Sequence, residues 1–173
     1  DELLEHIVAL DDGEAVDVSL VQAALRRLTL AGHVCPVLCG AAAVNIGVQP
    51  LLDAVHRYLP SPADRPPVRG VLEPDTPRAR EVDVALSDST PAALAFKVVW
   101  DRRRGPITFV KVYAGTLHAA QSVINTTGRH KERLARLLLP YADEYVDVRA
   151  LHAGQIGVVL GLRDTRTGDT LVG

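Results

Sequence analysis

A proline-rich stretch between residues 60 and 91 is the strongest constraint on how this chain of 173 residues can fold. It holds seven of the eleven prolines and few large apolar side chains, so it cannot build a hydrophobic core. Apolar residues recur with the period of a helix before this stretch and with the period of a strand after it. The sequence therefore predicts an α/β part over residues 1–60, a linker over 61–91, and a β domain over 92–173.

The α/β part is predicted to begin with a helix and a strand. Ser19 and Gln22 have the spacing of a helix capping box, and Gly32 follows the helical pattern as a stop signal. Residues 33–39 form a short apolar run that is typical of a strand buried on both faces. Pro36 within this run favours a position near the edge of the sheet.

A second helical pattern runs from residue 47 to Pro60, which completes an α-β-α unit of the kind that ends a doubly wound sheet. One strand cannot form a sheet, so we expect further strands of this domain to precede residue 1. The sequence also lacks methionine, even at position 1, which favours a piece of a longer protein.

The β domain is predicted from short alternating runs separated by turns that contain glycine. Their number and spacing within about 80 residues favour a small closed barrel. The runs cover residues 93–99, 107–113, 122–126, 133–139 and 155–160.

Charge is distributed unevenly along the chain. Lys and Arg minus Asp and Glu gives 7 − 14 = −7 for residues 1–91, 9 − 2 = +7 for 92–140, and 3 − 5 = −2 for 141–173. The basic block suggests a surface for an anionic partner, nucleic acid first, with a solvated surface as the alternative. The longest apolar stretch, residues 34–44, is shorter than the roughly 18 residues of a membrane span, so no membrane partner is expected.

No catalytic or metal-binding motif is evident in the 173 residues. Cys35 and Cys39 would lie about 13 Å apart along a strand, too far for a disulfide or a shared metal ion. The six histidines show no ligand spacing, and neither a nucleophile elbow nor a G-x-x-x-x-G-K-[ST] phosphate loop is present.

Two sets of motifs resemble translational GTPases of the elongation factor G type. The first set resembles the end of their GTP-binding domain: AALRR (23–27), PVLCGAA (36–42), GVQPLLDAV (47–55) and YLPSP (58–62). The second resembles their β-barrel domain II: LAFKV (94–98), GPITFVKVYAGTL (105–117), KER (131–133), AGQI (153–156) and GDTL (168–171). The resemblance implies the last α-β-α of a P-loop GTPase domain followed by an all-β translation-factor barrel.

The resemblance implies a guanine contact at Ala41, Ala42 and Ala43, the fifth nucleotide-binding motif. The family usually has Ser at the first of these positions, and the backbone N–H groups of the motif bind the guanine oxygen. GTP with Mg²⁺ is implied for the intact parent, whose phosphate loop would precede residue 1. No nucleotide is expected to remain bound to this chain alone.

The resemblance also implies that the barrel contacts small-subunit ribosomal RNA. Arg102, Arg103 and Arg104, before the turn at Gly105, are the first candidates for that contact. Arg129 and Lys131 are the next candidates.

Within the family, RLLLPYAD (136–143) and the long proline-rich linker look most like the mitochondrial paralogue that recycles ribosomes. That paralogue implies a mitochondrial matrix location and ribosome recycling factor as a further partner. A translocating, cytoplasmic elongation factor G stays open as the alternative. A self-contained β-barrel that binds RNA or protein without nucleotide is the alternative of another class.

Overall fold

The computed structural model describes residue 5, residues 16–72 and residues 76–173. The chain divides into two compact units, Asp1–Arg65 and Pro66–Gly173. Residues 1–4 and 6–15 of the predicted α/β part, and residues 73–75 of the predicted linker, lie outside the described residues.

Over residues 16–65 the first unit contains two α-helices, α2 (Val18–Leu30) and α3 (Val48–Tyr58). The predicted capping box at Ser19 is wrong, because α2 begins after Asp17, whose carboxylate accepts the N–H of Ser19 at 2.8 Å. An aspartate is as good a helix N-cap as a serine, so the helix starts earlier on the chain. Helix α3 ends before Pro60, as the sequence predicted.

The two helices are joined by the guanidinium of Arg26 on α2. It donates to the carbonyl of Arg57 on α3 at 2.7 Å and to the carboxylate of Asp64 at 2.8 Å. Asp64 also closes a capping box with Ser61 at the short 3₁₀ helix η2 (Pro62–Asp64). These polar contacts matter because the apolar core of the helices is small.

The strand predicted over residues 33–39 is not formed. Residues 34–40 have no regular structure, and the side chain of Val37 is 86% exposed. The only bridge in the described part of this unit joins Ala41 to Ile46. A strand requires a partner whose N–H and C=O groups pair with its own, and no described segment supplies one here.

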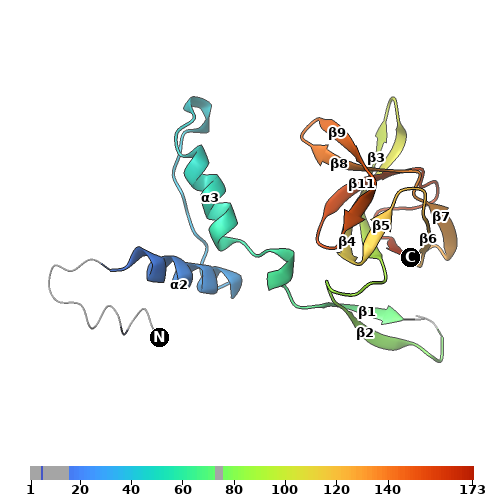
Figure 1. Cartoon of the computed structure of the whole chain (residues 1–173), viewed down its shortest axis with the longest axis horizontal. Coiled ribbons are helices and arrows are strands. Elements are labelled where there is room, and N and C mark those ends of the chain that lie inside the picture. The colour runs from blue at the N-terminus through green and yellow to red at the C-terminus, as the bar shows by residue number, and fades with distance from the viewer. Residues whose placement is uncertain (1–4, 6–15, 73–75) are drawn as a thin grey trace. The chain divides into compact units, whose positions relative to one another are not determined.

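The second unit is built almost entirely of antiparallel strands (Figure 1). Eight of them form one sheet in the order β7-β6-β12-β3-β4-β11-β8-β9, and β5 pairs with β10. Their bounds are β3 (Ala92–Asp101), β4 (Gly105–Ala114), β5 (Thr116–His118), β6 (Ser122–Asn125), β7 (His130–Arg133), β8 (Arg136–Tyr141), β9 (Glu144–Val148), β10 (Ala150–His152), β11 (Ile156–Leu160) and β12 (Thr170–Val172).

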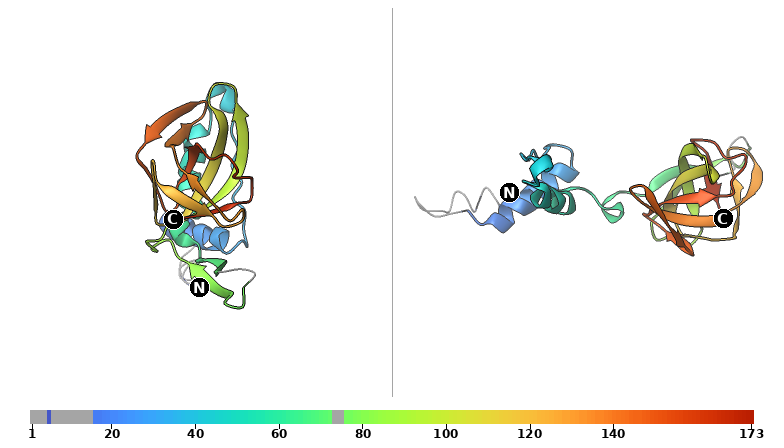
Figure 2. Two further views of the ribbon diagram at one scale, coloured as in Figure 1. Left: turned by 90° about the vertical axis from the view of Figure 1, so that its right-hand side faces the viewer. Right: turned by 90° about the horizontal axis from the view of Figure 1, so that it is seen from above.

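The sheet curls around an apolar interior, and the curl of its strands can be followed in Figure 2. Strand β4 illustrates why: Val110 and Val112 are fully buried, whereas Lys111 and Tyr113 between and after them are part-exposed, as the two-residue period of a strand requires. The predicted fold class, an α-β-α part followed by an all-β barrel, is confirmed as a small helical part followed by an antiparallel barrel-like domain, without the strand predicted over residues 33–39.

Part of the segment for which the sequence predicted a linker forms a hairpin. Strands β1 (Val68–Leu72) and β2 (Arg80–Val84) pair with Val68 opposite Val84 and Leu72 opposite Arg80. No side chain of the two strands is fully buried, in keeping with the absence of a core around the prolines. Prolines flank the paired runs without interrupting them, so the ladder of backbone hydrogen bonds is preserved.

Gly115 connects this segment to the barrel. Its N–H donates to the carbonyl of Asp88 at 2.8 Å, and its φ is +62°. A Cβ at this position would lie 2.6 Å from the backbone N of Pro91 and 2.7 Å from the carbonyl oxygen of Ser89. Only glycine permits this approach of two backbones.

We expect Gly115→Ala to lower the free energy of unfolding by about 2 to 5 kcal/mol, because backbone strain and overpacking add. Gly105→Ala is the matched control, since Gly105 has φ +74° with nothing within 4 Å of its Cβ position. The control should lose only about 1 to 2 kcal/mol. Urea unfolding monitored by circular dichroism measures both, and equal losses would contradict the close-approach argument.

Candidate functional site

The loop of residues 39–47, which contains the predicted guanine contact, is closed by backbone pairing. Ala41 and Ile46 exchange two hydrogen bonds, of 2.9 Å from the N–H of Ala41 and 3.1 Å from that of Ile46. The backbones at the two ends of the loop lie close together, since a Cβ on Gly40 would be 2.9 Å from the carbonyl oxygen of Ile46. Gly47, with φ +78°, then begins α3.

The three predicted residues are therefore not equivalent. The N–H of Ala41 already pairs with Ile46, whereas no backbone carbonyl of the described residues accepts from the N–H groups of Ala42 and Ala43. These two amides open the short 3₁₀ helix η1 (Ala42–Val44), where the first donors of a helix have no internal acceptor. Two donors therefore stay available in this loop.

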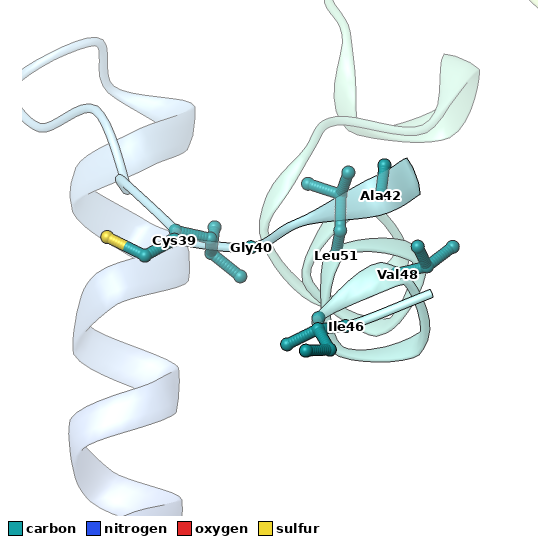
Figure 3. A pocket seen from close by; sticks show the side chains of 8 residues that line it. Cys39, Gly40, Ala42, Ile46, Val48 and Leu51 are labelled. Atoms are coloured by element: carbon teal, nitrogen blue, oxygen red, sulfur yellow. The ribbon is translucent and has the colours of Figure 1, made fainter. Parts of the chain in front are cut away.

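A shallow hollow of about 190 Å³ lies beside the loop. Its walls are mostly aliphatic, and Figure 3 shows Ala42, Val48 and Leu51 around it, with the Cys39 side chain extending away from Ala42 and Val48. An apolar wall beside unpaired N–H groups fits one edge of a flat ring that bears a carbonyl. Among the described residues no Lys or Arg lines this hollow, so it offers no cation to a phosphate group.

The second candidate set lies at the turn between β3 and β4, which Asp101 organises. Its carboxylate accepts the N–H groups of Arg103 and Arg104, both at 2.8 Å, and the Arg104 guanidinium lies 3.9 Å away. These two backbone hydrogen bonds lower the pKa of Asp101, and the one from Arg103 has the larger effect. Arg102 and Arg103 are exposed at the turn, and the Arg104 guanidinium lies 5.1 Å from the ring centre of Tyr145.

Arg129 and Lys131 lie near the turn between β6 and β7. Arg129 has φ +56° and is exposed, and Lys131 is exposed on β7. Asn125 holds the turn by accepting the N–H of Gly128 at 2.8 Å.

The structure brings Arg104 and Lys131 to one hollow of about 550 Å³, with Arg133 and Arg163. We call these four residues the cationic hollow. Arg133 and Arg163 were not among the contact residues predicted from the sequence. Arg133 was recognisable because residues two apart on a strand share a face with Lys131. Arg163 follows β11, and only the fold brings it to β7.

Glu132 lies between the two cations of β7 and points inward, with 7% of its surface exposed. Its carboxylate accepts the N–H groups of Arg163 and Asp164, both at 3.0 Å, and the hydroxyl of Thr165 at 2.9 Å. Burial raises the pKa of Glu132, but these hydrogen bonds outweigh it and hold the pKa below its usual range. The buried charge is thereby satisfied.

His130 completes this network. The Nε2 atom of its ring lies 3.3 Å from the Glu132 carboxylate. A hydrogen bond to the backbone of Gly128 and, to a smaller extent, this contact with Glu132 raise the pKa of His130 above its ordinary 6.5. Atoms of His130, Glu132 and Asp164 approach within 4.8 Å of one another, a spacing that a metal ion could use. The Glu132 carboxylate already receives three protein donors, so we interpret the group as a hydrogen-bond network.

The direction of the His130 shift predicts a pH dependence of stability. A group whose pKa is raised by folding stabilises the protein below its unfolded pKa, and this contribution is lost as pH rises through the folded pKa. The free energy of unfolding should therefore fall between about pH 6 and pH 8, and His130→Gln should remove that slope. Urea unfolding across this range tests it, and identical slopes in both proteins would contradict it.

No helix in the described part of the chain is long and apolar enough to cross a membrane.

Comparison with known proteins finds similarity for the second unit and for the whole chain. Residues 90–173 match the family model described as Elongation factor G domain 2. The chain is 42% identical over 180 residues to Elongation factor G of Fervidobacterium nodosum, covering 99% of this chain and 26% of that protein. A crystal structure of a Thermus thermophilus protein covers 99% of this chain with a TM-score of 0.67 and 26% identity, and this chain spans 24% of it. The second unit is therefore similar to domain 2 of elongation factor G, and the chain as a whole is similar to about a quarter of an Elongation factor G.

Proposed function

We propose that this chain is part of a GTP-hydrolysing translation factor that acts on the ribosome. The observation that carries the proposal is the 42% identity to an Elongation factor G across nearly the whole chain. Because the chain spans about a quarter of that relative, hydrolysis with GTP and Mg²⁺ belongs to the whole parent protein. In this proposal residues 1–60 are the C-terminal part of a GTP-binding domain, 61–91 a linker, and 92–173 domain II.

The loop with Ala41, Ala42 and Ala43 is proposed to contact guanine. Its support is the pair of unpaired N–H groups on Ala42 and Ala43 beside an aliphatic hollow. Ala41 is proposed to contribute by closing the loop through Ile46. A backbone donor does not depend on the side chain, so we propose that guanine recognition persists with alanine in place of serine, while any support from the serine hydroxyl is lost.

The barrel is proposed to contact small-subunit ribosomal RNA through Arg102, Arg103, Arg104, Arg129 and Lys131. Exposed arginine and lysine side chains supply sequence-independent affinity for phosphates. The carboxylate of Asp101 keeps the β3–β4 turn in one conformation, which lowers the entropy lost on binding.

For the biological role we propose ribosome recycling in the mitochondrial matrix, together with ribosome recycling factor. The support is the motif at residues 136–143 and the long proline-rich segment. Translocation is the second candidate, favoured by the identity to a bacterial Elongation factor G. Assays of the intact parent for ribosome splitting and for movement of messenger RNA distinguish the two roles.

We expect the 173-residue chain to bind GDP more weakly than micromolar. The loop of residues 39–47 offers donors for guanine but no cation for the phosphates, and the sequence has no phosphate loop to supply them. Isothermal titration with GDP and Mg²⁺ measures the affinity. A micromolar or tighter Kd would contradict this assignment of the loop and would require a different nucleotide site.

Replacing Arg102, Arg103 and Arg104 together with Ala should weaken binding to small ribosomal subunits. Each phosphate contact removed should lower the slope of log affinity against log salt by roughly 0.7 to 0.9. Exposed turn residues usually change stability by about 0.5 kcal/mol or less, so the melting temperature should be nearly unchanged.

Binding is measured by sedimentation with small subunits over a range of salt concentrations. An unchanged slope would show that these arginines make no phosphate contact. A parallel loss of affinity and melting temperature would show that the cluster is structural. Failure of the unmodified chain to bind subunits at all would favour a self-contained β module without ribosomal function.

A further inference from the structure

Trp100 is the only tryptophan of the chain, and 77% of it is exposed. It lies one residue before the β3–β4 turn that Asp101 organises. A large aromatic side chain exposed on an ordered hairpin loses the free energy of burial, which makes it a candidate contact for a partner.

The pairing of β3 with β4 shows which face of the hairpin carries Trp100. Val99, its neighbour, packs against a cluster of buried residues that includes Ile107 and Val158, so Trp100 faces the other side of the hairpin. Trp100 is directly opposite Pro106 on β4, and directly paired residues share a face of a sheet. Pro106 lines the cationic hollow. The indole therefore lies on the face of the hairpin that carries Pro106, at one edge of this hollow. The Arg104 guanidinium lies over Tyr145, which packs against the same cluster as Val99.

The hollow has the charge to hold phosphates. It is lined by Arg104, Lys131, Arg133 and Arg163, against the carboxylates of Glu132 and Asp164. Glu132 is committed to backbone donors inside the barrel and is 7% exposed, which leaves Asp164 as the one exposed carboxylate of the lining. The surface available to a ligand is thus net positive.

We propose that the β3–β4 hairpin and the cationic hollow together bind single-stranded RNA, with an unpaired base stacked on Trp100 and neighbouring phosphates in the hollow. The inference rests on the proposed ribosomal function and assigns a class of RNA to this surface. An aromatic platform beside a positively charged groove is the arrangement by which proteins hold single strands. Bases in a duplex are already stacked on one another, so a duplex leaves the indole unused.

A flat anionic membrane is a poorer partner for this surface. The cations line a concave hollow that Asp164 also lines, and the carboxylate of Asp101 lies 3.9 Å from the Arg104 guanidinium. A continuous negative surface would therefore meet carboxylates as well as arginines. Separate phosphates on a flexible strand can follow the cations and avoid the carboxylates.

The test uses the full chain and a labelled RNA of about 12 nucleotides, within the size range of known single-strand sites. Because Trp100 is the only tryptophan, quenching of its fluorescence reports stacking at this residue alone. Single-stranded RNA should quench it in a saturable manner. A duplex of the same length should quench it little and bind more weakly.

Variants separate stacking from charge. Trp100→Ala should weaken RNA binding by roughly 5- to 100-fold, and Trp100→Phe should retain most of the affinity. Neither should change the salt slope, whereas Lys131→Ala and Arg133→Ala should each lower it by roughly 0.7. Arg149→Ala, an exposed arginine between β9 and β10 outside the hollow, is the control and should alter affinity less than either.

Several results would overturn the inference. These are a Trp100→Ala variant that keeps its native circular dichroism spectrum and full affinity, a duplex that binds and quenches as well as the single strand, or quenching by anionic phospholipid vesicles in place of RNA. If the chain binds ribosomal subunits but RNA does not quench the fluorescence of Trp100, only this inference fails. If neither subunits nor RNA bind, the proposed function fails with it.

Discussion

The hydrogen bonds that the buried carboxylate of Glu132 accepts are the interaction on which the arrangement of the barrel surface depends most. It lies on β7 between two cations and accepts hydrogen bonds from the backbone of Arg163 and Asp164. A buried charge is costly unless it is hydrogen-bonded, so the loop after β11 is held against β7. Arg163 is thereby fixed beside Lys131 and Arg133, and the cationic hollow results from it.

A second group of polar side chains extends this network across the barrel. Asn125 on β6 donates to the buried carboxylate of Asp169 at 2.8 Å, and Asp169 accepts the N–H of Arg166. His130 connects the network to the β6–β7 turn through Gly128 and Glu132. Because each of these side chains has its partners, the polar network gives the loops one geometry without unpaired buried groups among the described residues.

The two units of the chain are stabilised by different means. The barrel has a large apolar interior, with residues such as Leu117, Leu151 and Val159 fully buried. In the helical unit only Ala24 and Ala54 are buried among the described residues, and Arg26 provides hydrogen bonds between helices. Much aliphatic surface of this unit is exposed, Val37 most of all. A small core and an unpaired extended segment predict that the helical unit opens at lower cost than the barrel.

The sequence by itself determined the class of each part and the positions of its strongest elements. Helix α3 and strands β3, β4 and β11 follow from periodicity and from glycine or proline at their ends, because these signals act within a few residues. The proline-rich segment marked a change of architecture, although the β1–β2 hairpin within it was missed because its prolines fall outside the pairing runs. The basic block and the alanines of the guanine loop were likewise visible as local composition.

Tertiary structure alone decided which of these residues meet. Residues 33–39 do not form a strand, because a strand needs a partner strand for its backbone hydrogen bonds. The periodicity of a sequence does not show whether such a partner is present. The capping preference of Asp17 over Ser19 and the pairing of Ala41 with Ile46 depend on backbone geometry. Arg163 reaches Lys131 through the curl of the sheet and the buried Glu132, and Trp100 shares a face with Pro106 through strand register. Contacts between residues distant in sequence arise from packing and register, which no local pattern encodes.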